Sequence, residues 1–415
     1  MCIGGCGGGG SRRHASAPLR RAPTGAPAPA EQRGPALGLT EDNADLLWNA
    51  RSSLRTGGEA FQPARLLLTA LHPRYVRLLI DWAALQPQAG TAAAMAATVD
   101  GCARASGPCG AYAGVQAQLA AIASQQRADP GAFRVVVDIL GTPAWAAQPP
   151  SACAPPATAA ARAPSPQALA AYRALIASLL ALARSEGVAL EWWSPWNEPN
   201  NPSFLSPQRA ACSAAAPSLA PALYTMLARA MAGELAASPG RHRLLIGELQ
   251  DVPADSPDST SVASFIAALP SDVVCLAGAF SIHDYALQRR RPGAGPGAVS
   301  ALEQALDARG GCASSVPIWV TEAGAGAPHP GRPRPPGAGD ELAGCLALAL
   351  QLRRWDADPR VGAVFQYSFR EDPAYPVGLL SADLARVYPA YRLWLQYAGA
   401  QAAGLPPPPP ALGCA

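Results

Sequence analysis

Residues 191–200 read EWWSPWNEPN, an apolar and aromatic run that stops at an Asn-Glu-Pro turn. The run is typical of a buried strand. Pro199 cannot donate a ladder hydrogen bond, so the strand must end near it. The turn therefore places the Glu198 carboxylate and the Asn197 amide together at the end of a buried strand.

Residues 316–324, which read VPIWVTEAG, repeat this design. Here the apolar run ends at Glu322, 124 residues after Glu198. Two glutamates that each end a buried strand predict a site of paired carboxylates at one edge of a parallel sheet.

Short apolar runs recur along the chain, and eight of them have the length of strands: residues 36–40, 75–80, 133–140, 190–196, 243–247, 273–282, 316–321 and 362–369. Helical stretches lie between them, most clearly at residues 166–186, 218–237, 299–308 and 341–355. Buried strands separated by helices predict βαβ units. Eight such units predict a closed (β/α)8 TIM barrel, of fold class α/β. A doubly wound open sheet is the alternative, but no glycine-rich phosphate loop follows an early strand.

Composition divides the chain into three parts. Residues 1–34 hold Gly, Arg, Ala and Pro with almost no large apolar residue, which predicts a disordered linker or signal remnant. Residues 35–400 carry the strand–helix alternation and are expected to form one domain, and residues 401–415 to form a proline-rich tail. Residues 3–6 resemble the end of a bacterial lipoprotein signal, so we hypothesise that translation starts upstream of Met1.

Charge and hydropathy exclude several function classes. The net charge is only +3 and no basic tract occurs, so no nucleic-acid partner is expected. No run approaches the ~18–20 apolar residues of a membrane span, so no transmembrane segment is expected either. We expect a monomer.

The ten cysteines are numerous for a reduced cytosol. They show no CxxC pair and no His at zinc spacing, so we expect no metal. Disulfides in an exported protein, extracellular or on the cell surface, are the better interpretation. The expected pairs are Cys102–Cys109, Cys153–Cys212 and Cys275–Cys312, whereas Cys345 and Cys414 either pair or stay free.

A barrel assembles its site where the strands end. Polar and aromatic side chains occur together at these ends: Arg77, Trp145, Asn197, Glu198, His283, Tyr285, Glu322 and Tyr367. Aromatic faces stack on the apolar faces of sugars while polar groups bind the hydroxyls. The set therefore predicts a carbohydrate site that needs no cofactor.

Two carboxylates can hydrolyse a glycosidic bond, one as proton donor and the other as nucleophile, if their surroundings differ. We expect Trp193 and Trp196 to give Glu198 the apolar company that keeps a carboxyl protonated. Arg77 and Tyr285 are expected to donate hydrogen bonds that keep Glu322 ionised. Glu248, at the end of the fifth run, is expected to bind an arginine or a substrate hydroxyl rather than act as acid or base.

The segments 196–200 and 319–324 resemble the clan of retaining (β/α)8 glycoside hydrolases that carry the acid/base on strand four and the nucleophile on strand seven. The cellulase-like family five and the β-xylosidase-like family thirty-nine are the most similar. Segments 75–77, 142–145 and 283–285 also lie at positions that match the pattern of this clan. The resemblance implies that Glu198 is the acid/base, Glu322 the nucleophile and Asn197 the ligand of the sugar 2-hydroxyl. It also implies that Arg77 and Tyr285 support the nucleophile.

Two positions depart from the clan. Strand eight ends in Tyr367 where a tryptophan often floors the sugar site, and Gly141 and Thr142 stand where the cellulase-like families often place a histidine. Both departures leave the identity of the sugar undetermined. The expected function is therefore a retaining hydrolase of β-linked glycans, with a non-catalytic glycan-binding barrel or a transglycosylase as alternatives.

Overall fold

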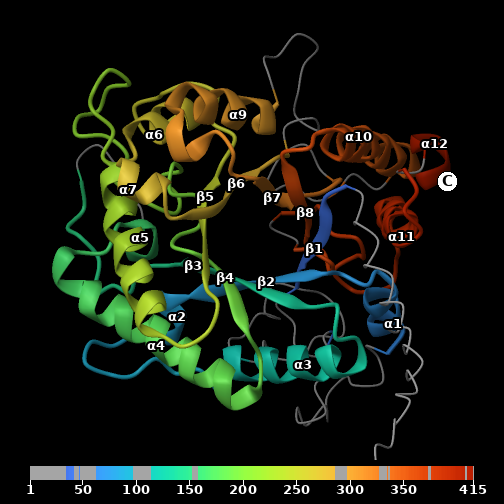
Figure 1. Cartoon of the computed structure of the whole chain (residues 1–415), viewed down its shortest axis with the longest axis horizontal. Helices are drawn as coiled ribbons and strands as arrows, with labels where there is room; N and C mark the ends of the chain where they lie inside the picture. Colours follow the sequence, from blue (N-terminus) through green and yellow to red (C-terminus); the bar gives the residue numbers. More distant parts are fainter. Residues whose placement is uncertain are drawn as a thin grey trace, which may run out of the picture. The chain divides into compact units, whose positions relative to one another are not determined.

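The computed structural model describes residues 34–41, 46, 62–96, 114–151, 158–285, 297–326, 334, 337–372, 375–406 and 409–414. Eight parallel strands close into a barrel in chain order, with β1 paired to both β2 and β8 (Figure 1). The strands are β1 (Ala36–Thr40), β2 (Tyr75–Asp81), β3 (Arg134–Leu140), β4 (Leu190–Ser194), β5 (Arg243–Leu249), β6 (Ala277–His283), β7 (Ile318–Ala323) and β8 (Val361–Tyr367). The predicted (β/α)8 TIM barrel is confirmed.

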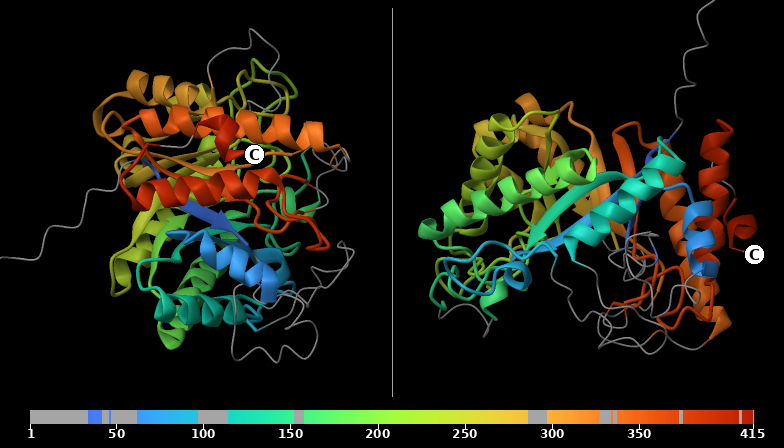
Figure 2. Two further views of the ribbon diagram at one scale, coloured as in Figure 1. Left: turned by 90° about the vertical axis from the view of Figure 1, so that its right-hand side faces the viewer. Right: turned by 90° about the horizontal axis from the view of Figure 1, so that it is seen from below.

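Helices cover the outside of the barrel, as the perpendicular views of Figure 2 show. The longer ones are α1 (Gln62–Ala70), α3 (Val115–Ala128), α4 (Leu169–Glu186), α5 (Ala220–Ala237), α9 (Ala298–Arg309), α10 (Ala338–Ala357) and α11 (Pro389–Ala402). Shorter ones are α2 (Trp82–Leu85), α6 (Val262–Ala268), α7 (Ser271–Val274) and α12 (Pro410–Gly413). The first and last of the long helices meet, because the Tyr391 hydroxyl of α11 donates to the Leu67 carbonyl of α1 at 2.9 Å.

The sixth strand begins later than the sequence predicted. Residues 273 and 274 belong to the helical turn α7, which starts after Pro270, and β6 begins only at Ala277. Val273 and Val274 are buried all the same. A short apolar run does not distinguish a buried helical turn from a strand, which is why this prediction was wrong.

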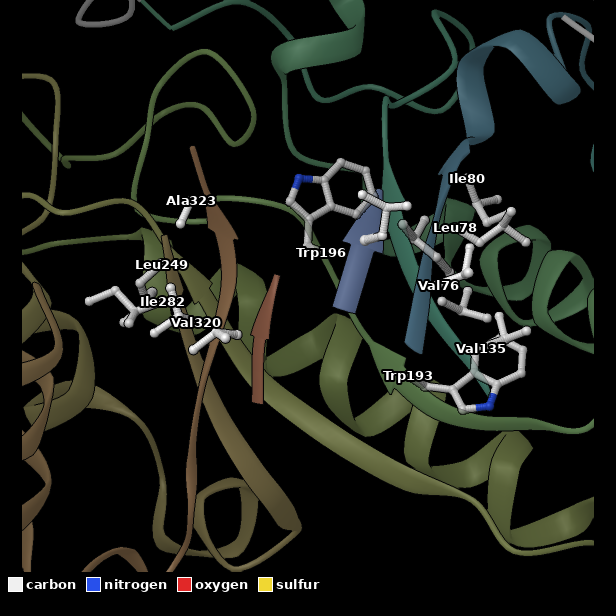
Figure 3. Close-up of a cluster of buried hydrophobic side chains, with 14 of the residues drawn as sticks. Val76, Leu78, Ile80, Val135, Trp193, Trp196, Leu249, Ile282, Val320 and Ala323 are labelled. Carbon is white, nitrogen blue, oxygen red and sulfur yellow. The ribbon is translucent and has the colours of Figure 1, made fainter. Parts of the chain in front are cut away.

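One apolar layer lies between the strands and the helices. Val76, Leu78 and Ile80 project from the same side of β2 into this layer (Figure 3). Side chains alternate along a strand, so Arg77 faces the opposite way, into the barrel. The outward face of β2 therefore anchors the helices while its inward face carries the functional residue.

A second apolar cluster fills the lower part of the barrel interior. Every strand contributes to it: Ala36, Tyr75, Val136, Trp192, Leu245, Ala279, Trp319, Ala363 and Phe365. Trp192 and Trp319 are in ring contact at 4.3 Å between centroids. Gly38 leaves room for this packing, because a Cβ there would lie 2.2 Å from the Phe365 ring. These rings close the barrel from below.

The interior becomes polar one layer higher. Two residues beyond the apolar cluster, five strands present buried polar side chains: Arg77, Asp138, Ser194, Ser281 and Thr321. Inward-facing residues recur every second position, so one strand can supply both layers. The polar layer lies toward the carboxyl ends of the strands, where barrel enzymes hold their sites.

Two disulfides join described residues. The predicted Cys275–Cys312 pair is present, and Cys345 of α10 pairs with Cys414. Cys212 is also disulfide-bonded, but Cys153, its predicted partner, lies outside the described residues, as do Cys102 and Cys109.

Within the described ranges, one helical stretch, Pro166–Glu186, is long and apolar enough to cross a membrane. Its buried side includes Tyr172, Leu175, Ile176 and Leu179, which pack in the layer between barrel and helices. A single stretch of this kind is weak evidence for a span, and the packing accounts for its apolar composition.

Candidate active site

Arg77 lies at the centre of the polar layer and is fully buried. Its Nη1 donates to Glu322 Oε1 at 2.6 Å. Its Nη2 lies within hydrogen-bond distance of Asp138 Oδ2 (2.7 Å), Asn197 Oδ1 (2.8 Å) and Glu248 Oε2 (3.1 Å). Burial alone would lower the pKa of Arg77, but the surrounding carboxylates raise it well above its usual value. Arg77 therefore stays charged and joins the ends of β2, β3, β4, β5 and β7.

Glu322 receives a second hydrogen bond on its other oxygen. The Tyr285 hydroxyl donates to Glu322 Oε2 at 2.9 Å. Burial and the charge of Glu322 raise the pKa of Tyr285 well above its usual value, so the phenol keeps its proton. Both donors that the sequence placed beside Glu322 are thus in contact with it, and both favour its ionised form.

Glu198 occupies a strained backbone position at the turn after β4. Its φ is +38°, in the left-handed region that side chains other than Gly rarely adopt. Glu198 Oε1 lies 2.8 Å from His283 Nδ1, and Glu198 Oε2 accepts from Asn201 Nδ2 at 2.5 Å. The Ser203 amide donates to Asn201 Oδ1, which fixes the orientation of the Asn201 amide. Strain of this kind persists where the surroundings enforce it, often at functional sites.

The expected tryptophan surroundings of Glu198 need correction. Trp193 and Trp196 belong to the core between barrel and helices (Figure 3), and their indole N–H groups bind backbone carbonyls. The groups that contact the Glu198 carboxylate are instead His283 and Asn201. Trp193 faces outward because it alternates with Trp192, which faces the interior. The surroundings of Glu198 are therefore polar.

Glu198 and Glu322 face each other at the top of the cluster. A carboxylate oxygen of each lies within 4.8 Å of the other. Both side chains are 10% exposed, whereas the Arg77 and Glu248 side chains are 0% exposed. Of these four ionisable groups, Glu198 and Glu322 are the ones that a substrate can reach.

A bulge in β5 turns Glu248 into the barrel. The register between β5 and β6 shifts between Ile246 and Leu249, so two residues oppose Ser281. Gly247 has φ +125° and a Cβ there would lie 2.4 Å from the Ser281 carbonyl oxygen, so only glycine fits. The Glu248 amide then donates to Ser281 Oγ at 2.7 Å.

A single oxygen of Glu248 has three polar neighbours. Besides Arg77, His283 Nε2 lies 2.8 Å from Glu248 Oε2, and Thr321 Oγ1 donates to it at 2.7 Å. Burial alone would raise the pKa of Glu248, but the Arg77 charge and the hydrogen bonds from His283 and Thr321 lower it. Glu248 is thus an ionised buried group bound to Arg77, in keeping with the sequence analysis.

His283 lies between the carboxylates. Burial alone would lower its pKa, but the Glu322 charge and the contacts with Glu198 and Glu248 raise it to about 10. Among the described residues, Glu198, His283 and Glu322 form a trio whose ligand atoms are close enough for a metal ion. A metal binds the neutral imidazole, however, and would have to displace a proton from the His283 ring, whose pKa is raised, so this trio fits a metal ion poorly.

The remaining two predicted residues stand farther out. Trp145 is half-buried, and its indole N–H donates to the Gln86 carbonyl in the loop after β2 rather than to a glutamate. Tyr367, at the end of β8, is in edge contact with Tyr375, which in turn contacts Tyr285 at 4.9 Å between centroids. The three tyrosines form an aromatic wall beside Glu322.

Sequence reasoning missed Asp138, Asn201 and Tyr375. Asp138 had a clear signal, because it is the one acidic residue inside the apolar run of β3. Asn201 follows the Asn-Glu-Pro turn by two residues and looked like part of the loop. Tyr375 lies in the loop after β8, where nothing in the sequence indicates which aromatic ring turns inward.

An apolar groove of about 490 Å³ lies elsewhere, between α6 and α9 on the outer layer. Gln304 and Arg309 are the polar residues in its lining. The groove includes none of the carboxylates described above, so the candidate active site remains the cluster at the strand ends.

No protein-family model matches the sequence, and no curated protein matches it. Solved structures share the fold. SrfJ from Salmonella typhimurium aligns with a TM-score of 0.57 and 10% identity, over 88% of this chain and 75% of its own. A family 5, subfamily 18 glycoside hydrolase from Streptomyces cattleya, in complex with GlcNAc, aligns with a TM-score of 0.50 and 17% identity. The alignment covers 91% of this chain and 82% of the hydrolase. An endo-β-1,6-glucanase aligns with a TM-score of 0.51 and 12% identity, over 89% of this chain and 77% of its own.

At these identities the likeness shows the fold alone. The chain has the (β/α)8 barrel that named glycoside hydrolases also have. What the site does must be argued from its own residues.

Proposed function

We propose that this chain is a retaining O-glycoside hydrolase that cleaves β-linked glycans through a glycosyl-enzyme intermediate. The observation that carries the proposal is the approach of a Glu198 oxygen and a Glu322 oxygen to within 4.8 Å. Retaining enzymes hold their carboxyl groups about 5–5.5 Å apart, whereas inverting ones leave about 6.5–9.5 Å for a water molecule. The short separation therefore supports a nucleophilic role for one of the two glutamates.

The contacts indicate which glutamate is which. A retaining mechanism needs one carboxylate as nucleophile and one carboxyl group as proton donor. Arg77, which stays charged, donates to Glu322, and Tyr285 adds a second hydrogen bond. These two donors favour Glu322 as the nucleophile and leave Glu198 as the proton donor.

In the first step, Glu322 attacks the anomeric carbon and Glu198 donates its proton to the leaving oxygen. The bond to the leaving group breaks as the ester to Glu322 forms. In the second step, Glu198 takes a proton from water, and the hydroxide attacks the same carbon from the opposite side and releases Glu322. Two inversions give net retention.

The other predicted residues complete the sugar site. Asn197 is held at the rim by Arg77 through its Oδ1, which leaves its amide nitrogen to donate to the sugar 2-hydroxyl. The aromatic wall of Tyr285, Tyr367 and Tyr375 supports stacking of a sugar ring beside Glu322.

We propose export as the setting of this activity. The Cys275–Cys312 and Cys345–Cys414 disulfides are of the kind that persists in an oxidising compartment. A polysaccharide outside the cytoplasm would be accessible there.

The direct test is a panel of aryl β-glycosides and polysaccharides, assayed with the wild type and with Glu322→Ala. We expect the wild type to release aglycone or reducing ends from at least one substrate. We expect Glu322→Ala to lose several orders of magnitude in kcat, because no intermediate forms without the nucleophile.

Glu341→Ala is a matched control. Glu341 is another buried glutamate on the described chain, but it pairs with Arg386 on the outer layer and not with the site. Full activity in Glu322→Ala would end the assignment. Binding of a glycan by the wild type without any cleavage would favour a non-catalytic glycan-binding barrel.

A further inference from the structure

Glu248 has no direct part in the two-carboxylate mechanism, yet it connects both halves of it. Its Oε2 contacts Arg77, which donates to Glu322, and His283, which contacts Glu198. The side chain is 0% exposed, so no substrate reaches it. Any effect of Glu248 on the reaction must therefore act through Arg77 and His283.

The two ring nitrogens of His283 face carboxylate oxygens. Nε2 lies 2.8 Å from Glu248 Oε2, and Nδ1 lies 2.8 Å from Glu198 Oε1 and 3.3 Å from Glu322 Oε2. An ionised carboxylate only accepts hydrogen bonds, so Nε2 must carry a hydrogen toward Glu248. Nδ1 then also needs a hydrogen whenever the glutamates that it faces are ionised. Nδ1 faces an ionised Glu322 before the first step and an ionised Glu198 in the intermediate, so the doubly protonated ring is the form that suits both states.

We propose that Glu248 is a positioning residue that holds His283 as an imidazolium, so that its Nδ1–H is aimed between Glu198 and Glu322. The roles of these two glutamates rest on the proposed function. The link between Glu248 and His283 does not, since it is a property of the free protein.

A shared Nδ1–H suits a reaction in which charge moves between two carboxylates. Before the first step Glu322 is ionised, and the Nδ1–H group, whose nitrogen lies 3.3 Å from Glu322 Oε2, adds to the stabilisation from Arg77. Once Glu322 is esterified, Glu198 is left as the carboxylate that must act as base. The same Nδ1–H, 2.8 Å from Glu198 Oε1, then stabilises that charge. One donor can thus serve both steps without a movement of the ring.

Charged and titratable groups face His283 from every strand packed around it. Glu198 follows β4, Glu248 ends β5, and Glu322 ends β7. Asp138 on β3 adds a further acidic group, and Arg77 on β2 is the opposing cation that contacts Glu248. Burial raises the pKa of Asp138 well above its usual value despite Arg77, so Asp138 tends toward the neutral acid. The two positive charges of Arg77 and His283 then balance the two negative charges of Glu248 and Glu322.

The protonation of His283 can be measured without any substrate. Nitrogen-15 NMR of the imidazole rings distinguishes the imidazolium from either neutral tautomer. The sequence has five histidines, so the His283 signal is the one that persists when His14, His72, His242 and His329 are each replaced by Gln. We expect the wild-type His283 ring to be doubly protonated at pH 7 and to titrate near pH 10. A neutral His283 ring at pH 7 in the wild type would overturn the proposal, even if no Glu248 variant folded.

Two substitutions at Glu248 then test its part. Glu248→Gln keeps the shape but removes the charge, and we expect the pKa of His283 to fall below its wild-type value, because one of the three carboxylates that raise it is gone. Glu248→Asp keeps the charge, and we expect the imidazolium to return. Thr321→Val is the matched control, because it removes one hydrogen bond to the same oxygen and leaves the charge in place. An unchanged His283 titration in Glu248→Gln would contradict the proposal.

Kinetics supply the second readout. We expect Glu248→Gln to lower kcat/KM by about 100-fold, the size of effect that a misplaced reacting group produces. Its activity should also fall with rising pH as His283 loses its proton, whereas Glu248→Asp should retain a profile like that of the wild type. Absence of glycosidase activity in the wild type would remove the proposed function, but the NMR result would still decide the link between Glu248 and His283. An altered NMR titration with an unchanged pH–activity profile would refute the positioning role.

Discussion

Arg77 and Glu322 are joined across the barrel, from β2 to β7, by a hydrogen bond of 2.6 Å between Nη1 and Oε1. The same guanidinium reaches Asp138, Asn197 and Glu248. Arg77 thus compensates the buried acidic groups of the site and also orients the proposed nucleophile. Its loss should affect both the stability of the fold and the reaction.

Arg77→Met should destabilise the protein by about 3–5 kcal/mol, because removal of one partner leaves buried carboxylates uncompensated. Arg77→Lys should fold but have a lower kcat/KM, since a single ammonium group cannot reproduce the planar set of donors of the guanidinium. Urea unfolding and kcat/KM measure the two effects. Arg229→Lys is the control, as Arg229 pairs with Asp272 on the exposed surface. Equal stability of Arg77→Met and the wild type would contradict this role.

Azide should separate the two glutamates. In Glu198→Ala an aryl glycoside with a good leaving group still forms the intermediate, but no base activates water. We expect azide, which needs no base, to restore turnover and to yield a glycosyl azide of retained configuration, identified by NMR. Azide acting on Glu322→Ala should give the inverted product. The reverse pattern would exchange the roles assigned to Glu198 and Glu322.

The stability of the protein should depend on pH through His283. Its folded-state pKa is raised to about 10, whereas an unfolded histidine titrates at about 6.5. A raised pKa gives a contribution that is complete below the unfolded value and is lost as pH rises through the folded value. The free energy of unfolding lost in His283→Gln should therefore be largest near pH 6 and should shrink toward pH 10. If the free energies of unfolding of the wild type and His283→Gln ran parallel across the pH range, the result would argue against a charged His283.

The Cys275–Cys312 disulfide closes a loop across 37 residues between α7 and the segment before β7. Replacing both cysteines by Ser should lower the free energy of unfolding by about 3–4 kcal/mol, because the unfolded chain regains the freedom of that loop. Chemical unfolding measures the loss. Activity at low temperature should survive, since neither cysteine is part of the site. A variant as stable as the wild type would show that the packing alone holds this region.

The periodic apolar runs made the barrel predictable. Strands β1 to β8 lie where eight runs stand in the sequence, and the error at residues 273–276 arose because a buried helical turn is as apolar as a strand. Glu198 and Glu322 were predictable because each ends such a run. A strand end is visible in a sequence, so the residues that stand there could be named.

Contacts between distant strands were less visible. The sequence indicated Arg77 and Glu248 separately, but only the closed barrel shows that they meet, and the β5 bulge that turns Glu248 inward depends on Gly247. Trp193 was misplaced because neighbouring residues on a strand face opposite ways, and the register that decides which faces inward is a property of the whole sheet. Asn201 and Tyr375 lie in loops, whose conformation the sequence pattern constrains least.

The anomeric configuration of the first product tests the central claim most directly. Proton NMR would follow the cleavage of a β-glycoside identified in the substrate panel, sampled before mutarotation equilibrates the sugar. The short separation of Glu198 and Glu322 predicts that the β-anomer appears first and the α-anomer only later. Initial release of the α-anomer would mean a single displacement by water, and would contradict the assignment of Glu322 as nucleophile.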